Sequence, residues 1–372
     1  MRITFLSPIP SLAGGIKVIA TYARKLADRG HEVVVIATPS WRRTFRSMVR
    51  DLIKQRKWPV ASAGLSHYDV MGVSVRLLDT HRPIVDSDVP DADVVIATWW
   101  ETAEWAARLS PSKGAKTYMI QGHETWGTEE DARRSNATWS LPLHKIVVAH
   151  WLKNLAREFG DTDVSVVPNS VDLQQFYAPP RSRQEPPTVG LLYSTMPLKG
   201  VDVSLAAIEK ARRIIPDLQI RAFGQLPVER SLPLPHGAHF TQSPDQAHIR
   251  EIYSRCDVWI CASRNEGFGL TVLEAMACRC PVVVTRCGGP EDFVRDGWNG
   301  FLVPVEDADA LAQKLVEVLS AAPSVWQQMS ANALATATSY TWDDATDAFE
   351  AALHRSIAKT QTVGTVRSAA GI

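Results

Sequence analysis

The chain has 372 residues, more than one hydrophobic core usually organises, so we expect two domains of about 170 to 190 residues each. Hydrophobic residues make up 45% and charged residues 22%, as in ordinary globular proteins, and the formal net charge is zero. This balance provides no general attraction for nucleic acid. No apolar run approaches the length of a transmembrane helix, and the chain enters a strand directly, so we expect a cytoplasmic protein.

The first half of the chain alternates between apolar runs typical of buried strands and longer helical segments. A helix is expected at 16–29, closed by Gly30, and strands at 2–6, 33–37, 94–98, 116–120 and 145–149. This alternation indicates a parallel sheet covered on both faces. Ligands of such sheets bind beyond the carboxyl ends of the strands, so the loops that follow the strands should line a cleft.

Two of these loops carry candidate binding residues. Gly14 and Gly15 open the first helix and can bring backbone N–H groups close to a ligand, although a double glycine also serves turn geometry alone. The loop at 121–126 gathers polar and aromatic side chains: His123, Glu124 and Trp126. A histidine after a strand is by itself more often a satisfied loop residue than a catalytic one.

Residues 41–58 differ from their surroundings. Apolar residues recur there at helical spacing, and seven cations accompany one acid, Asp51. The segment therefore forms either a solvated helix packed on its domain or a basic amphipathic helix lying on an anionic membrane surface. In the second case the protein would be peripheral at the inner face of the cell membrane.

A proline-rich polar segment divides the two halves, since 168–187 contains five prolines. We expect an N-terminal domain at 1–168, a linker at 169–187 and a C-terminal domain at 188–340. The second half repeats the alternation, with strands at 188–193, 218–223, 258–262, 281–285 and 301–303 and helices at 201–215, 247–255, 270–278 and 308–320. All five cysteines fall between Cys256 and Cys287 without zinc-site spacing, so they are interpreted as reduced core residues.

The segment at 263–274 combines the end of a buried strand, a glycine loop and the start of a helix. Gly267 and Gly269 allow close approach of the backbone, and the N–H groups of Phe268, Gly269 and Leu270 would point out of the helix N-terminus, where phosphate binds well. Two carboxylates frame this position. Glu266 can reach a neutral polyol, and Glu274 can accept both hydroxyl groups of a ribose, so the combination fits a nucleotide sugar.

This segment resembles the E-x7-E signature of retaining GT-B glycosyltransferases of family 4. The glycine pair at 14–15, the Pro-Asn-Ser-Val-Asp sequence at 168–172 and the Lys-Gly-Val-Asp sequence at 199–202 resemble further motifs of that family. The resemblance implies two doubly wound Rossmann-like domains that face a central cleft, the N-terminal one binding the acceptor. It also implies a last helix, at 341–358, that packs back across the interface, and we expect a mobile tail at 359–372.

The resemblance further implies roles for individual residues. Lys199 would stabilise the diphosphate leaving group, His123 would lie against the donor sugar, and Glu266 would orient sugar hydroxyls without attacking the anomeric carbon. Gly14 and Gly15 would face the transferred sugar, while Glu124 and Trp126 would contact the acceptor. No metal or other cofactor is expected.

One position departs from the family pattern. The arginine that often stands five residues before the lysine is replaced here by Ser194. The hydroxyl groups of Ser194 and Thr195 are candidates to contact phosphate instead, and Arg264 is a candidate to supply the missing charge.

We therefore expect retaining transfer of a sugar, a hexose or deoxyhexose, from a nucleotide diphosphate. The acceptor would be a glycan or lipid-linked saccharide, in the synthesis of cell-surface polysaccharide or glycolipid. Three alternatives remain open: a GT-B phosphorylase that uses sugar 1-phosphate, a non-catalytic nucleotide-sugar binder, and a metal-dependent GT-A enzyme. The last would use one of the Asp-x-Asp sequences at 86–88, 91–93, 161–163 and 307–309.

Overall fold

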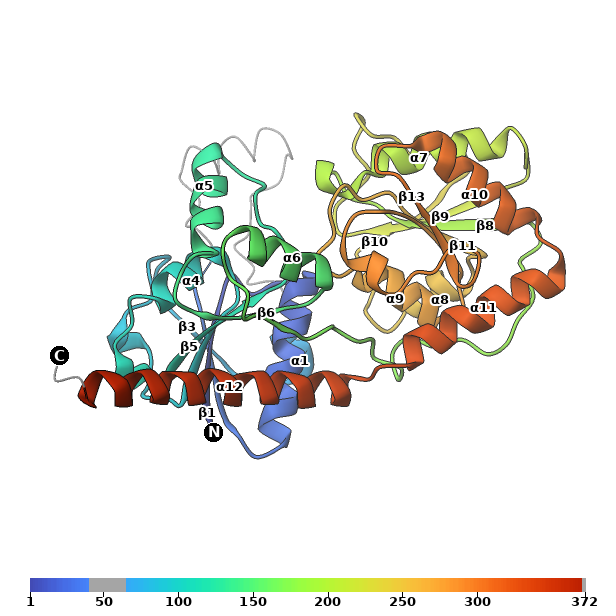
Figure 1. Ribbon diagram of the computed structural model, residues 1–372. Coiled ribbons are helices and arrows are strands. Elements are labelled where there is room, and N and C mark those ends of the chain that lie inside the picture. Colours follow the sequence, from blue (N-terminus) through green and yellow to red (C-terminus); the bar gives the residue numbers. More distant parts are fainter. Residues whose placement is uncertain (40–64, 370–372) are drawn as a thin grey trace. The chain divides into compact units, whose positions relative to one another are not determined.

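The computed structural model describes residues 1–39 and 65–369, shown as ribbons in Figure 1. The chain forms two compact units, which are described separately. Unit 1 comprises Met1–Val147, Lys153–Val167 and Thr346–Ile372, and unit 2 comprises Val148–Leu152 and Pro168–Ala345. The basic segment predicted at 41–58 lies outside the described residues.

Unit 1 is built on a parallel sheet of seven strands in the order β3-β2-β1-β4-β5-β6-β7. The strands are β1 (Arg2–Ser7), β2 (Glu32–Ala37), β3 (Val75–Leu77), β4 (Val94–Ala97), β5 (Ala115–Ile120), β6 (His144–Val147) and β7 (Ser165–Val166). The helices between them are α1 (Gly14–Asp28), α3 (His67–Met71), α4 (Trp100–Ala106), α5 (Glu129–Thr138) and α6 (His150–Glu158), of which α6 belongs to unit 2 as far as Leu152. Helix α1 ends before Gly30, whose φ of +85° suits a residue without a side chain.

Unit 2 contains a parallel sheet of six strands in the order β10-β9-β8-β11-β12-β13. The strands are β8 (Thr188–Leu192), β9 (Gln219–Gly224), β10 (His239–Gln242), β11 (Val258–Cys261), β12 (Val282–Thr285) and β13 (Gly300–Val303). The helices are α7 (Val201–Arg212), α8 (Ile249–Ser254), α9 (Leu270–Ala277), α10 (Ala308–Ser320) and α11 (Pro323–Thr338). The two sheets confirm the prediction of two doubly wound Rossmann-like domains.

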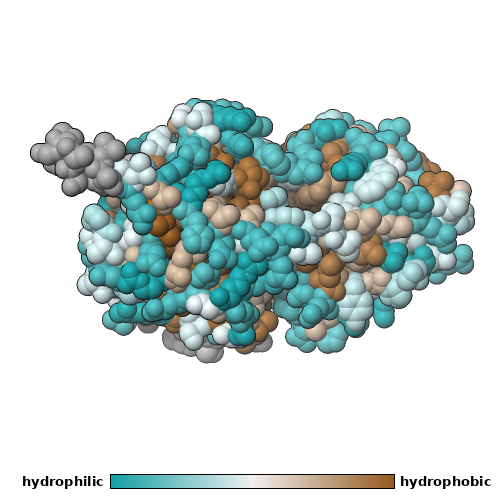
Figure 2. Space-filling view, turned by 60° about the horizontal axis from the view of Figure 1, so that its bottom comes forward, coloured by the Kyte–Doolittle hydropathy of each residue, from teal (hydrophilic) through white to brown (hydrophobic). Residues whose placement is uncertain are grey.

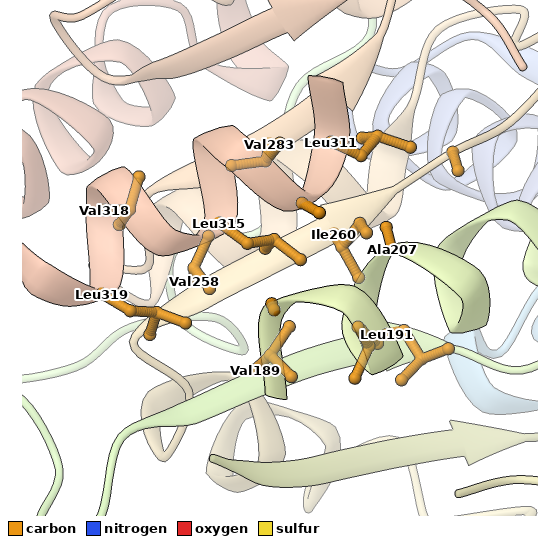
Figure 3. Close-up of a cluster of buried hydrophobic side chains, with 14 of the residues drawn as sticks. Val189, Leu191, Ala207, Val258, Ile260, Val283, Leu311, Leu315, Val318 and Leu319 are labelled. Atoms are coloured by element: carbon orange, nitrogen blue, oxygen red, sulfur yellow. The ribbon is translucent and has the colours of Figure 1, made fainter. Parts of the chain in front are cut away.

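The core of unit 2 lies between its sheet and helices α7 and α10 (Figure 3). Val258 and Ile260 of β11 meet Leu311 and Leu315 of α10, and all four side chains are at most 1% exposed. Strands buried on both faces need nearly continuous apolar sequence, which explains why these strands were recognisable from the sequence. All five cysteines are also buried and free, as predicted for core residues.

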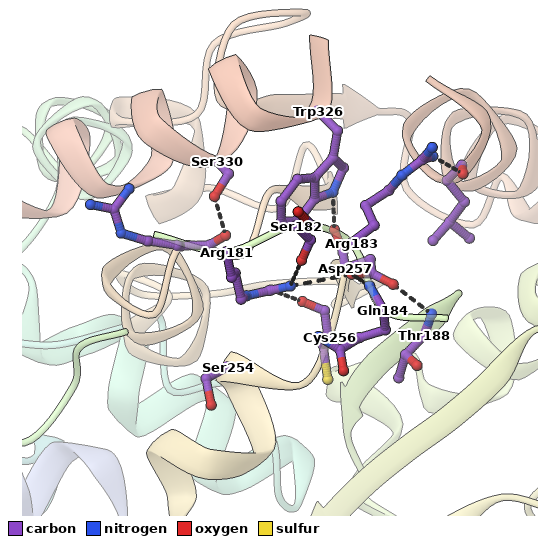
Figure 4. A network of polar contacts seen from close by, with 12 residues as sticks. Arg181, Ser182, Arg183, Gln184, Thr188, Ser254, Cys256, Asp257, Trp326 and Ser330 are labelled. Atoms are coloured by element: carbon purple, nitrogen blue, oxygen red, sulfur yellow. Dashed lines mark hydrogen bonds and ion pairs between the residues drawn. The ribbon is translucent and has the colours of Figure 1, made fainter. Parts of the chain in front are cut away.

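The linker is fixed to unit 2 by a buried aspartate (Figure 4). Asp257 is fully buried and accepts hydrogen bonds from the N–H groups of Gln184 and Thr188, each at 2.8 Å. The Arg181 guanidinium pairs with the same carboxylate at 3.2 Å and lies over the ring of Trp326. Burial nevertheless raises the pKa of Asp257. The network holds the chain at the start of β8, the strand that leads to the candidate site.

Helix α12 (Trp342–Ala369) begins in unit 2 and belongs to unit 1 from Thr346 onward. Its Phe349 is fully buried and stacks on Tyr22 of α1, with ring centroids 4.2 Å apart. Arg29 adds an ion pair to Asp347 of this helix at 2.6 Å. The helix continues past the expected end at 358, so the described residues between there and Ala369 are helical where we expected a tail.

Some elements were not predicted from the sequence. They are the short strands β3, β7 and β10, the unit 1 helices α3, α4, α5 and α6, and the helix α11, whose sequence lacks a strong amphipathic pattern. Figure 2 shows hydrophobic and hydrophilic residues mixed over one face of the molecule. Among the helices of the described ranges, none combines the length and hydropathy needed to cross a bilayer.

Candidate active site

In unit 2 the strand order reverses between β8 and β11, which are neighbours in the sheet although β9 and β10 separate them in sequence. The loops that follow these two strands therefore emerge side by side at the carboxyl edge. Such a switch point is the usual ligand site of doubly wound sheets. The loop after β8 carries Lys199, and the loop after β11 carries Glu266, so the topology brings together two residues that lie far apart in the sequence.

A glycine makes this close approach possible. Gly200 has a φ of +55°, and a Cβ atom at this position would lie 1.9 Å from the carbonyl oxygen of Ala262 at the end of β11. Both the dihedral angle and the contact exclude a side chain. The short 3₁₀ helix η3 (Pro197–Lys199) is thereby held against β11, and the N–H of Arg264 donates to the Leu198 carbonyl at 2.8 Å.

Lys199, Glu266 and Ser263 form a compact polar cluster. The Lys199 ammonium lies 2.8 Å from Oε1 of Glu266, and the Ser263 hydroxyl donates to the same oxygen at 2.8 Å. The side chains of Lys199 and Glu266 are 28% and 12% exposed. Burial disfavours the ammonium, but the negative charge of Glu266 and its hydrogen bond outweigh this effect, so the pKa of Lys199 is raised. Lys199 is therefore a cation at neutral pH.

The backbone around Glu266 is fixed by the loop that follows β12. The N–H of Glu266 donates to the Cys287 carbonyl at 2.7 Å, and the N–H of Gly289 donates to the Glu266 carbonyl at 3.0 Å. A Cβ atom on Gly289 would lie 2.3 Å from Cα of Phe268, so the two loops pack backbone against backbone. This packing sets the direction in which helix α9 begins.

Gly269 is the N-cap of α9, with a φ of +93° and no side-chain hydrogen bond to cap the helix. The carbonyl of Gly267 accepts a hydrogen bond from the indole N–H of Trp151 at 3.0 Å, while the Phe268 side chain is buried. Leu270 begins the helix. The predicted phosphate-binding amides thus lie at the N-terminus of a helix beside the Lys199–Glu266 pair.

Glu274 lies one turn inside α9 and is only 8% exposed. Its Oε2 accepts a hydrogen bond from the fully buried Tyr253 hydroxyl at 3.0 Å. Burial and the neighbouring carboxylate raise the pKa of Tyr253 well above its usual value, so the phenol remains a donor. The structure therefore gives Glu274 a fixed orientation that the sequence could not show.

The arginine proposed as a substitute cation is already engaged. The Arg264 guanidinium pairs with Asp202 at 2.8 Å, also pairs with Glu306, and donates to the Pro197 carbonyl. These contacts tie the η3 loop to unit 2, and the two acids raise the pKa of Arg264. Ser194, at the position of the missing arginine, accepts a hydrogen bond from the Met196 N–H at 3.2 Å, and Thr195 follows it in the same loop. As placed here, Arg264 braces the loop and does not present a free cation.

In unit 1 the candidate residues lie on loops at the carboxyl edge of the sheet. Gly14 and Gly15 begin α1, and the side-chain amide of Gln121 donates to the Gly15 carbonyl at 3.2 Å. The loop after β1 and the loop after β5 are thereby joined. His123 has its Nε2 2.7 Å from Oδ1 of Asn136 in α5, which fixes the orientation of its ring.

The two predicted acceptor residues have different surroundings. Glu124 is 6% exposed and accepts a hydrogen bond from the Trp100 N–H at the start of α4, at 3.1 Å. Burial raises the pKa of Glu124 well above its usual value. Trp126 is 40% exposed. The geometry therefore favours a structural role for Glu124 and leaves Trp126 available to a ligand.

The Asp-x-Asp sequences serve local structure. Asp88 pairs with Arg82 at 2.6 Å, Asp161 pairs with Lys145 at 2.7 Å, and Asp307 caps helix α10 through the Ala310 N–H. Within the described ranges, no three His, Cys, Asp or Glu side chains are grouped as they would be around a metal ion. The GT-A alternative has no support in these positions.

Comparisons with known proteins agree with this architecture. Residues 13–175 match the family described as Glycosyltransferase Family 4, and residues 187–321 match Glycosyl transferases group 1. A D-inositol 3-phosphate glycosyltransferase of Mycolicibacterium gilvum is 31% identical over 186 residues, which are 47% of this chain and 40% of that protein. The match therefore covers less than half of the relative's length.

Two solved structures resemble almost the whole chain. Sucrose-phosphate synthase from Thermosynechococcus elongatus has a TM-score of 0.72 at 16% identity, covering 96% of this chain and all of that one. Anabaena HepE, solved in complex with UDP and glucose, has a TM-score of 0.71 at 17% identity, covering 95% and 99%. The fold is thus that of the GT-B class. The family matches at 13–175 and 187–321, taken together, show that the chain belongs to the family 4, group 1 glycosyltransferases.

Proposed function

We propose that the protein is a retaining glycosyltransferase that transfers a sugar from a nucleotide diphosphate sugar to an acceptor held by unit 1. The observation that carries this proposal is the placement of Lys199 and Glu266 at the switch point of unit 2, beside the N-terminus of α9. A cation and helix-terminal amides suit a diphosphate, and a carboxylate beside them suits sugar hydroxyls.

Each group then has a defined part in the reaction. As the bond between sugar and diphosphate breaks, negative charge grows on the leaving phosphate, and Lys199 with the N–H groups at 268–270 stabilises it. Glu266 orients the sugar hydroxyls, while Glu274 holds the ribose. His123 contacts the donor sugar. This assignment of His123 depends on the family resemblance, and the fixed imidazole is compatible with it.

We also propose that no metal ion takes part. A cation that could offset the diphosphate charge supports this proposal, because the raised pKa of Lys199 keeps its ammonium protonated beside the N-terminus of α9. Transfer should continue in EDTA. Loss of transfer in EDTA that added Mg²⁺ restores would contradict this part of the proposal.

The donor can be identified by a thermal-shift screen with UDP-, GDP-, ADP- and dTDP-sugars, because a ligand that binds only the folded state raises the melting temperature. HepE has been solved with UDP-glucose, so this donor is the first to test. Transfer from sugar 1-phosphate but not from any nucleotide sugar would instead indicate a phosphorylase. Binding of a nucleotide sugar with neither transfer nor hydrolysis would indicate a non-catalytic binder.

Lys199→Ala tests the leaving-group role directly. We expect transfer to fall about 100-fold or more, as when one preorganised partner of a developing anion is lost, while the circular dichroism spectrum stays unchanged. Lys210→Ala is the matched control, because Lys210 lies on α7 and pairs with the exposed Asp309. Near wild-type turnover of Lys199→Ala would place the diphosphate site elsewhere.

A further inference from the structure

Two tryptophans lie together at the carboxyl edge of the unit 1 sheet. Trp99 follows β4 and Trp126 follows β5, and these strands are neighbours. Their ring centroids are 6.0 Å apart with the planes tilted by 56°. Trp126 is 40% exposed, and Trp99 is partly exposed. Two loops thus contribute one aromatic surface.

This surface is not required by the core. The neighbouring Trp100 and Trp139 are 5% and 1% exposed and supply the aromatic packing in this part of unit 1. A single exposed apolar side chain is common on protein surfaces. Two neighbouring indoles that are open to water offer a larger apolar surface, which suits a ligand with an apolar face.

The surrounding loop is held in place by hydrogen bonds on both sides of the tryptophan. Gln121 is bonded to Gly15, and His123 is bonded to Asn136, as described above. After the tryptophan, Thr128 caps α5, and its N–H and hydroxyl both donate to Asp131. The loop that carries Trp126 is therefore fixed on both sides of this residue.

The charges near this surface disfavour an anionic ligand. The first turn of α5 contains three acids, Glu129, Glu130 and Asp131. Both arginines of that helix are engaged, since Arg133 pairs with Glu130 at 2.7 Å and Arg134 pairs with Glu104 at 2.6 Å. In this helix, then, no guanidinium is left over for a phosphate group, and a neutral ligand fits better.

We propose that Trp99 and Trp126 form the platform on which an uncharged pyranose ring of a saccharide acceptor stacks. A pyranose presents C–H groups on one face, and these can stack on an exposed indole face while the hydroxyls around the edge of the sugar stay in water. This inference rests on the proposed glycosyl transfer and narrows its acceptor to a neutral saccharide. It predicts that a phosphorylated acceptor of the kind named for the M. gilvum relative does not stack on this platform.

The test uses the full chain labelled with ¹⁵N, whose 12 tryptophans give separate indole N–H signals. Trp126→Phe and Trp99→Phe assign the two signals. Maltose, cellobiose, methyl α-mannoside and methyl α-galactoside serve as neutral probes, and inositol 1-phosphate serves as the charged probe. We expect at least one neutral probe to shift both signals and inositol 1-phosphate to shift neither.

Variants then separate stacking from a structural effect. Trp126→Ala should weaken binding of the responding saccharide about tenfold or more, whereas Trp126→Phe, which keeps an aromatic face, should retain most of it. Trp298→Ala is the matched control, because Trp298 is 38% exposed and belongs to unit 2. It should leave saccharide binding unchanged.

Two results would overturn the inference: no neutral probe moves the Trp99 and Trp126 signals, or inositol 1-phosphate moves them at least as strongly. Nucleotide-sugar binding is measured on the same samples. If nucleotide sugars bind but no neutral saccharide does, the result contradicts only the inference about the acceptor. If no nucleotide sugar binds either, the result contradicts the proposed function as well.

Discussion

Lys199 and Glu266 form an ion pair in the structure, and this pair leaves hydrogen-bond donors of the lysine for a ligand. The ammonium can donate up to three hydrogen bonds, of which Glu266 accepts one at 2.8 Å. A diphosphate can therefore share the lysine without displacing the glutamate. Ser263 holds the same carboxylate oxygen, so Glu266 keeps its position when the lysine turns toward phosphate.

The two glutamates should respond differently to the loss of charge. Glu274→Gln keeps an oxygen that can accept from Tyr253, so the fold should persist, but a neutral amide holds a ribose diol less well. We expect affinity for free nucleoside diphosphate to fall about tenfold, or 1.4 kcal/mol. Glu266→Gln should spare that affinity and reduce sugar transfer. Calorimetric titration with nucleoside diphosphate measures the affinity of each variant. An equal loss of affinity in Glu266→Gln and Glu274→Gln would contradict these roles.

The sequence indicated Glu266, Glu274 and Lys199 because each lies in a short motif whose spacing reflects local backbone geometry. It did not indicate Ser263 or Tyr253 as their partners, since those contacts depend on how separate elements pack. The same limit applies to Glu124. Its place in a polar loop predicted a ligand contact, but the fold buries the carboxylate against the start of α4.

At the scale of elements, long apolar strands and several amphipathic helices were predicted, but short edge strands and the helices between the later strands of unit 1 were not. Strand β7 has two residues and β3 has three, so neither provides enough sequence for a periodic pattern. Helix α12 was predicted, but the sequence alone could not show what its apolar side chains meet. Phe349 completes the core of unit 1, from which it is separated by the whole of unit 2 in sequence.

Phe349→Ala should therefore destabilise unit 1. Truncating a fully buried phenylalanine removes its burial and leaves a cavity, which together cost about 3 to 5 kcal/mol. Urea unfolding measures the change, and His354→Ala on the exposed face of the same helix is the control. A loss below about 1 kcal/mol would mean that α12 contributes little to this core.

At the scale of the whole molecule, unit 1 carries an acid-sensitive feature in two buried histidines. The pKa values of His67 and His144 are lowered to about 4, mainly because burial disfavours the imidazolium, and Lys17 and Lys359 add to the effect. The stabilisation from their neutral forms is complete above the unfolded pKa near 6.5. It is lost as the pH falls toward 4.

Between pH 7 and pH 5 each histidine should reduce the free energy of unfolding of unit 1 by about 2 kcal/mol. His67→Gln and His144→Gln should each make this loss smaller by a similar amount in urea unfolding at the two pH values. The exposed His248 of unit 2 provides a control in His248→Gln. Identical pH dependence in the wild type and both buried-site variants would show that these histidines titrate normally.

The packing of α12 on unit 1 also affects the order in which the two units can fold during translation. Translation delivers Met1–Val147 first, yet the surface of α1 that receives Phe349 stays uncovered until unit 2 has been synthesised. Unit 2 has its sheet and its helices α10 and α11 by Thr338, so it can fold on the ribosome while unit 1 still exposes part of its core. A chaperone that shields apolar surface should therefore associate with nascent chains that end between Val167 and Thr346. A chain truncated after Ala345 should keep that association after release.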